Sequence, residues 1–170
     1  DIVNIRKIKN MTQKKKAFIT GITGQDGSYL TELLLSKNYQ VAGLVRRNVS
    51  NSLGNIEHLK DEVAIYHGEM QSPESISLAL YDFKPDEIYN LAAQSSPLAS
   101  FHDKVGTMMS TGIGAVNVFE SARRTVPKAR IYQASTSEMF GAPTEVPQIE
   151  STSFAPMNPY AAAKEYAHRM

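Results

Sequence analysis

KAFITGITGQDG, residues 16–27, joins a short apolar run to three glycines spaced three residues apart. The apolar run predicts a β-strand, and helical spacing of Leu30, Leu33 and Leu34 with Tyr29 predicts a helix that begins near Ser28. Glycine tolerates positive φ at a tight turn and lets the backbone approach a pyrophosphate, which helix N-terminal amides then face. The junction therefore predicts a phosphate-binding loop, although turns also collect glycines for backbone reasons alone. The loop residues expected to bind are Gly21, Thr23, Gly24, Gln25, Asp26 and Gly27.

The rest of the chain repeats this order of strand, turn and helix. Short β-branched runs predict strands over residues 17–20, 41–45, 63–66, 87–91 and 130–133. Helical spacing recurs around Ile76, Leu78, Ala79 and Leu80, across residues 112–124, and across residues 160–170. Crossover helices between successive strands imply a parallel sheet with helices on both faces. The sequence predicts an α/β fold with a doubly wound parallel sheet, a Rossmann fold, that is incomplete at the C-terminus.

The composition excludes several classes of protein. The chain has 170 residues, a net charge of +1 and no long run of like charges beyond Lys14, Lys15 and Lys16, which argues against nucleic-acid and membrane partners. The absence of cysteine and the scattered positions of the four histidines predict no metal site. No apolar run approaches the roughly 20 residues that cross a bilayer, and no signal peptide opens the chain. The cytoplasm is the expected compartment.

Two arginines follow the second predicted strand. In a dinucleotide-binding fold, an acidic residue at this place would hydrogen-bond an unmodified adenosine ribose. Here the chain has Arg46 and Arg47, whose guanidinium groups suit a 2′-phosphate. The sequence therefore favours NADP over NAD, against the alternative of a solvated basic strand end.

A Tyr-x-x-x-Lys pair opens the last predicted helix. Spacing of four places Tyr160 and Lys164 on one helical face, so that the ammonium can lie beside the phenol. A neighbouring positive charge favours the phenolate, which would make Tyr160 usable as a base. Lys164 would also hold the nicotinamide ribose. A single pair of this kind arises often by chance.

A hydroxyl and a carboxylate follow the fifth predicted strand. If the segment continues in extended form, Thr136 and Glu138 share one side of the strand's carboxyl end, where ligands bind in open α/β sheets. Together they could orient a sugar hydroxyl and move a carbon-bound proton. The alternative is a Ser/Thr-rich turn with a solvated glutamate.

These motifs together resemble the extended short-chain dehydrogenase/reductase family. The resemblance is carried by T-G-x-x-G-x-x-G at residues 20–27, Asn-Leu-Ala-Ala-Gln-Ser at 90–95, the hydroxyl-rich segment 135–137, and Tyr160 with Lys164. More narrowly, residues 21–30, 45–47, 56–59, 90–95 and 133–138 resemble the GDP-mannose 4,6-dehydratases, and the similarity runs from about Lys15 to the last residue.

This resemblance implies an internal redox cycle on a nucleotide sugar, most simply GDP-mannose. Tyr160 would take the C4 hydroxyl proton while NADP accepts hydride from C4, and Thr136 would hydrogen-bond the C4 oxygen. Glu138 would remove the C5 proton and help water leave from C6, after which the hydride returns to C6. Glu138 is the informative residue, because epimerases and reductases of the family need no carboxylate for that proton.

The resemblance also implies further cofactor contacts and a domain plan. Cofactor contacts are expected from Tyr160, Lys164 and two loops, with residues Glu69, Met70, Leu91, Ala92, Ala93, Gln94 and Ser95. Glu69 stands where the family usually has an aspartate, and residues 105–114 lack the tyrosine and aspartates expected of the dehydratases. We expect an N-terminal extension over residues 1–13, a truncated NADP-binding domain over 14–170, and a nucleotide-sugar-binding part outside this chain. Relatives associate through helices like 112–124, which implies a homo-oligomer, a dimer or tetramer.

Three functions stay open at this point. The first is the dehydratase, for GDP-mannose or for another GDP-hexose or heptose. The second is an NADP-dependent nucleotide-sugar epimerase or reductase, which would gain if Glu138 faced away from the nicotinamide. The third is a non-catalytic NADP-binding protein on the same fold.

Overall fold

The computed structural model describes residues 14–46, 52–143 and 145–170. Its sheet has five parallel strands in the order β3-β2-β1-β4-β5. Their bounds are β1 Lys16–Thr20, β2 Gln40–Val45, β3 Val63–His67, β4 Glu87–Asn90 and β5 Arg130–Gln133. The predicted strands are confirmed, with ends displaced by one residue at most. The reversal of strand order between β1 and β4 is the switch point at which doubly wound sheets bind ligands.

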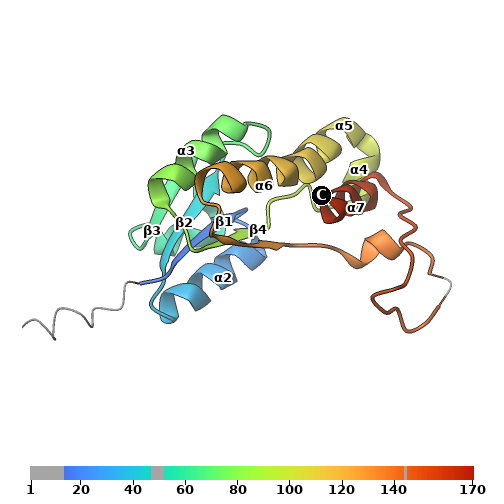
Figure 1. The fold of residues 1–170 in the computed structure, drawn as a ribbon, viewed down its shortest axis with the longest axis horizontal. Coiled ribbons are helices and arrows are strands. Elements are labelled where there is room, and N and C mark those ends of the chain that lie inside the picture. The colour runs from blue at the N-terminus through green and yellow to red at the C-terminus, as the bar shows by residue number, and fades with distance from the viewer. Residues whose placement is uncertain (1–13, 47–51, 144) are drawn as a thin grey trace, which may run out of the picture.

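In this part of the chain, six α-helices connect and flank the strands (Figure 1). They are α2 Gln25–Ser36, α3 Pro73–Phe83, α4 Pro97–His102, α5 Lys104–Thr107, α6 Gly114–Thr125 and α7 Pro159–Arg169. A π-helical turn, Met108–Ile113, joins α5 to α6, and two 3-10 helices cover Gly54–Leu59 and Ser137–Phe140. Helices α4, α5 and α7 lie beyond the carboxyl ends of the strands.

The inner strands β2, β1 and β4 are buried on both faces, and alternate residues of each strand point to opposite sides. Phe18 of β1 packs with Ile88 and with α3 and α6 on one face, through Leu80 and Val118. On the other face Ile19 packs with α2 and the 3-10 helix Gly54–Leu59. Figure 1 shows α3 and α6 together on one side of the sheet and α2 on the other. The predicted doubly wound architecture is confirmed.

Helix α2 buries mainly small residues near its start. Tyr29 and Leu33 are 64% and 50% exposed, and the buried residues of the helix are Gly27, Ser28, Thr31 and Leu34. The helix begins so close to β1 that only small side chains fit there, since a Cβ on Gly27 would lie 2.7 Å from the Ile22 Cα. The predicted helix is confirmed, and two of the residues whose spacing predicts it face solvent.

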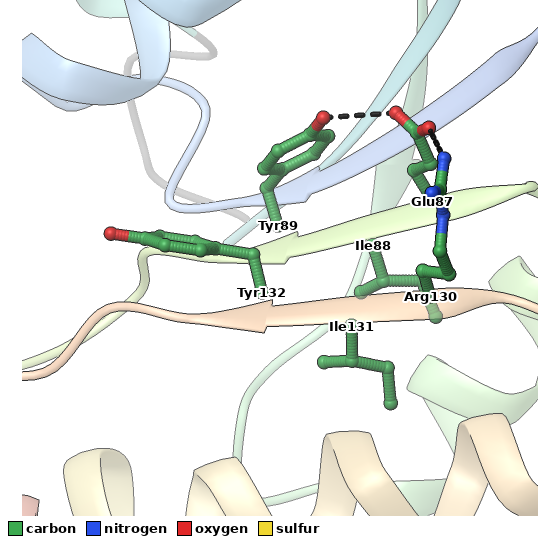
Figure 2. Close-up of a pocket in the computed structure, with 6 residues that line it drawn as sticks. All are labelled: Glu87, Ile88, Tyr89, Arg130, Ile131 and Tyr132. Carbon is green, nitrogen blue, oxygen red and sulfur yellow. Dashed lines mark hydrogen bonds and ion pairs between the residues drawn. The ribbon is translucent and has the colours of Figure 1, made fainter.

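A shallow hollow lies at the amino ends of β4 and β5, away from the loops at their carboxyl ends. Figure 2 shows Tyr89 and Tyr132 on one side of the two strands, with ring centroids 6.2 Å apart, and Ile88 and Ile131 on the other. Glu87 is buried here and accepts hydrogen bonds from Tyr89 at 2.9 Å and Arg130 at 2.6 Å. This cluster joins the first residues of β4 and β5.

No helix in residues 14–46, 52–143 and 145–170 has the length and apolar character needed to cross a membrane.

Candidate active site

The loops that carry the predicted site residues all leave the same edge of the sheet. The strands are parallel throughout, so the segments after β1, β2, β3, β4 and β5 emerge at their common carboxyl edge. Residues 21–24, 91–95 and 134–138 follow the three adjacent strands β1, β4 and β5. The fold thus gathers groups that are far apart in the sequence.

The glycine-rich loop is held against the loop after β4. Gly21 has a φ of +72°, which favours glycine, and a Cβ on it would lie 2.9 Å from the Ala92 nitrogen. The Ala92 N–H donates to the Thr20 hydroxyl at 3.2 Å. A side chain at position 21 would therefore push the two loops apart at the switch point.

Helix α2 begins without a side-chain cap. Its N-cap residue, Gly24, supplies no side-chain hydrogen bond to the first turn, whereas the side chains of Ser72, Ser96 and Asn158 cap α3, α4 and α7. The N–H groups at the start of a helix need acceptors and carry the positive end of its dipole. The first turn, which starts at Gln25, is therefore suited to an anionic phosphate.

The 3-10 helix Gly54–Leu59 lies beside this loop, a contact that the sequence interpretation did not include. The Asn55 amide donates to the Thr23 carbonyl at 3.1 Å, and His58 lies 2.9 Å from the Glu32 carboxylate of α2. Asn55 therefore anchors the backbone of the glycine-rich loop at Thr23. An asparagine next to glycine is a common turn signal and would not by itself have indicated this contact.

The loop after β4 is anchored by its own polar groups. The Gln94 N–H donates to the Thr111 hydroxyl at 3.1 Å, and the Gln94 side chain accepts from the Ser96 N–H at 3.0 Å. Leu91, Ala92, Ala93 and Ser95 belong to the same loop. The π-helical turn that carries Thr111 thus connects this loop to the helices beyond the sheet edge.

A chain of hydrogen bonds crosses the sheet edge from β1 to α7. Thr20 donates to Asn90 at 2.5 Å, and Asn90 donates to Gln133 at 2.6 Å. Gln133 then donates to the Ala134 carbonyl at 2.9 Å, which also accepts from the Lys164 ammonium at 2.7 Å. Buried polar groups are stable only when they are paired, and this series of hydrogen bonds gives each of these side chains a partner. This series of hydrogen bonds fixes the position of the Lys164 ammonium at the carboxyl end of β5.

Tyr160 and Lys164 lie together on the buried side of α7. The Lys164 nitrogen is 5.8 Å from the centre of the Tyr160 ring, as the spacing of four predicts. Lys164 is only 4% exposed, and this burial lowers the pKa of its ammonium. Its ammonium is held in this buried position by the hydrogen bond to the Ala134 carbonyl at 2.7 Å.

Thr136 and Glu138 do not share an extended strand, so the expectation from period-two alternation is wrong in its geometry. Thr136 is extended, but it caps the 3-10 helix Ser137–Phe140, accepting from the Glu138 N–H at 3.2 Å. Glu138 therefore lies on a helical turn. Its carboxylate is exposed and accepts a hydrogen bond from the Asn158 amide at 2.9 Å, immediately before α7.

Asn158 is the residue of this site that the sequence interpretation missed. It is the N-cap of α7, and its side-chain oxygen accepts from the Ala161 N–H at 2.7 Å. An asparagine followed by proline at the start of a predicted helix is a standard N-cap signal, which could have identified this role. Its contact with Glu138 depends on tertiary structure.

The remaining predicted cofactor residues lie at the ends of β2 and β3. Arg46 is exposed directly after β2, while Arg47 lies outside the described residues. Glu69 is exposed, and its N–H donates to the Ser75 hydroxyl at 3.2 Å. Met70 packs against the core, and its carbonyl accepts from Asn117 at 2.9 Å. Neither Glu69 nor Met70 is tied to the glycine-rich loop by a hydrogen bond among the described residues.

Comparison with solved structures defines the class of protein. The UDP-glucose 4-epimerase of Thermus thermophilus, solved in complex with NAD, matches with a TM-score of 0.78 and 26% identity, over 91% of this chain and 49% of that chain. The shared fold, a parallel sheet with helices on both faces, is that of the extended short-chain dehydrogenase/reductases.

The family within this class is also defined. The family model for GDP-mannose 4,6 dehydratase matches residues 18–170, so the chain belongs to this family. A GDP-mannose 4,6-dehydratase of Yersinia enterocolitica is 42% identical over 163 residues, covering 91% of this chain and 44% of the relative. A human GDP-mannose 4,6 dehydratase is 41% identical over 162 residues, covering 89% and 44%. The chain therefore spans less than half the length of these relatives.

Proposed function

We propose that the complete protein is an NADP-dependent GDP-mannose 4,6-dehydratase, a hydro-lyase. The observation that carries this proposal is the position of Glu138. Its carboxylate accepts a hydrogen bond from Asn158, which caps α7 and lies two positions before Tyr160 in the sequence. A carboxylate so close to a Tyr–Lys pair can serve a proton transfer that an epimerase or reductase does not need. The membership of the dehydratase family supports the same reaction.

The residues at the carboxyl edge fit a nicotinamide dinucleotide. Gly21 and Gly27 have no room for a Cβ, because neighbouring backbone atoms lie too close to both. The first turn of α2 has no side-chain cap, so its N–H groups are available to a phosphate. The diphosphate would lie at this turn, between residues 21–27 and 91–95, and Lys164 would hold the nicotinamide ribose. Exposed Arg46, with Arg47 next to it in the sequence, favours the 2′-phosphate of NADP.

Each catalytic side chain would then perform one proton or hydrogen-bonding step. When bound, the cofactor supplies the chemistry of accepting hydride from sugar C4 and returning it to C6. Tyr160 removes the C4 hydroxyl proton, and Thr136 hydrogen-bonds the resulting C4 oxygen. The C4 ketone acidifies the C5 hydrogen, which Glu138 takes as a proton while the C5–H electrons form the C5=C6 bond. The C6 hydroxyl leaves as water with the proton that Glu138 returns. When hydride is returned to C6, C5 takes up one proton, which balances the proton that Tyr160 removed from the C4 hydroxyl.

The rest of the protein would complete the site. We propose that residues outside this chain supply the sugar-binding part, with residues 14–170 as the dinucleotide-binding domain and 1–13 as an extension before it. We also propose a cytoplasmic homo-oligomer. The size of the oligomer is measured by light scattering on the complete protein.

The function is tested by giving the complete protein GDP-mannose with catalytic NADP. We expect a product lighter by one water, detected by mass spectrometry, with no net change in cofactor. Glu138→Gln should abolish water loss while NADP binding, measured by calorimetry, is retained. An epimer of unchanged mass would instead establish an epimerase, and net consumption of NADPH in a parallel assay supplied with NADPH would establish a reductase.

A further inference from the structure

Asn158 makes two side-chain hydrogen bonds that point in different directions. Its oxygen accepts from the Ala161 N–H at 2.7 Å, which caps α7. Its nitrogen donates to Glu138 Oε2 at 2.9 Å. One side chain therefore joins the first turn of the Tyr160 helix to the carboxylate on the neighbouring 3-10 helix.

The orientation of the Asn158 amide is set by the backbone. The Ala161 N–H can only donate, so the amide oxygen must face it and the NH₂ group must face Glu138. Asn158 is held extended, at φ −143° and ψ 160°, and Pro159 restricts it further because a residue before proline avoids helical conformations. The donor to Glu138 is therefore preorganised.

Other contacts hold the same two segments together. The Ala155 N–H donates to the Met139 carbonyl at 2.9 Å, and the rings of Phe140 and Phe154 meet edge to face at 5.0 Å. Phe154 in turn contacts His168 of α7, with ring centroids 5.1 Å apart. The distance between the two helical segments is thus fixed without Asn158, which leaves its amide to orient the carboxylate.

We propose that Asn158 is a positioning residue for the carboxylate of Glu138, a role that rests on the proposed dehydratase function. By occupying Oε2, the amide holds the carboxylate in one rotamer and leaves Oε1 to meet the C5 hydrogen. Among the described residues, no hydrogen bond to Oε1 is present. Proton transfer is sensitive to such geometry, since a displacement of about 1 Å can slow a reaction about 100-fold.

Two substitutions in the complete protein separate positioning from capping. Asn158→Asp keeps an oxygen for the Ala161 N–H but places a second carboxylate against Glu138. Asn158→Ala removes both hydrogen bonds without adding a charge. Capping strength should therefore fall most in the alanine variant, and positioning of Glu138 should fall most in the aspartate variant.

The readout for positioning is hydrogen exchange at C5 of the 4-keto-6-deoxy product in D₂O, which requires the base but no hydride transfer. We expect exchange about 10- to 100-fold slower in both variants, slowest for Asn158→Asp, with the KM for GDP-mannose unchanged within about twofold. The melting temperature should show the opposite order, lowest for Asn158→Ala.

Two results would overturn the proposal. One is exchange at the wild-type rate in both variants, and the other is a loss of exchange that follows the melting temperature, with alanine worse in both. Failure of the proposed function looks different, because wild-type protein would then release no water from GDP-mannose.

Discussion

The backbone around position 27 leaves room for glycine and for no larger residue. It lies at the start of α2, where a Cβ would meet the Gly21 carbonyl oxygen and lie 2.7 Å from the Ile22 Cα. Backbone atoms cannot move aside as a flexible side chain can. The glycine is therefore required for α2 to begin this close to β1, and hence for its N-terminal amides to reach the sheet edge.

Gly27→Ala is predicted to destabilise the protein by about 1–3 kcal/mol and to weaken NADP binding, because the helix start must move away from β1. The matched control is Gly24→Ala, whose nearest contact would be the Gly21 oxygen at 3.2 Å. Chemical denaturation and calorimetric titration of NADP measure both effects. Equal losses in the two variants would contradict the packing explanation.

At the residue scale the sequence predicts chemistry better than it predicts contacts. Tyr160 and Lys164 could be placed on one face because helix periodicity is a local property. The contact between Glu138 and Asn158 joins residues 20 apart across a loop, which no local pattern encodes. The alternative for this segment, a Ser/Thr-rich turn with a solvated glutamate, describes its local structure better than strand alternation does, because the Thr136 hydroxyl caps a 3-10 helix there and ends the extended segment.

Strands β4 and β5 are joined at their amino ends by a buried carboxylate (Figure 2). Burial acts to raise the pKa of Glu87, but hydrogen bonds from Tyr89 and Arg130 and the charge of Lys15 outweigh it, so the pKa lies below its usual value. Glu87 in turn helps to raise the pKa of Tyr89 to about 12, after the larger effect of burial. The cluster favours an ionised glutamate in the folded protein.

Stability should therefore depend on Glu87 in acid. A folded-state pKa below the unfolded one gives stability that is present above the unfolded pKa, about 4.3, and is lost as pH falls through the folded pKa. Comparing urea unfolding at pH 7 and near pH 3, we expect wild type to lose on the order of 1 kcal/mol more than Glu87→Gln. Identical losses in both proteins would show that the cluster contributes no acid sensitivity.

Whole elements are the features that the sequence predicts best. All five strands were predicted, because short β-branched runs alternate with helical segments along the chain. The side of α2 that faces solvent could not be predicted, because Tyr29 and Leu33 are exposed while Leu34 is buried. Helices α4 and α5 carry exposed Leu98, Phe101 and Val105, and the π-helical turn carries exposed Met109, so these segments have no clear amphipathic signal.

In the described chain, the sheet has two edge strands, β3 and β5, and β5 is the one that leads into residues 134–138 of the candidate site. β5 pairs with β4 on one side, while Ile131 and Tyr132 are 39% and 55% exposed. The N–H groups of Arg130 and Ala134 donate toward β4, so by alternation those of Ile131 and Gln133 point to the open edge. An exposed apolar edge strand is prone to unwanted pairing.

In the complete protein we predict that this edge is covered by residues outside the chain. The amides of Ile131 and Gln133 should then exchange with deuterium as slowly as those within the β1–β4 ladder. Native-state hydrogen exchange with mass spectrometry measures this. Rapid exchange at both positions would mean that β5 is a true edge strand. At this scale sequence patterns give the topology of the chain, but not what pairs with its last strand.

The cap at Thr136 also gives the site a direction. A hydroxyl has one proton and two lone pairs, and here a lone pair is engaged by the Glu138 N–H. The proton and the second lone pair remain for a ligand, so the Thr136 hydroxyl can donate to an oxygen that gathers negative charge. Adjacent hydrogen bonds polarise one another, so the bond accepted from the Glu138 N–H strengthens the hydroxyl as a donor. The turn that ends the extended segment thereby also prepares this side chain to stabilise an oxygen on a ligand.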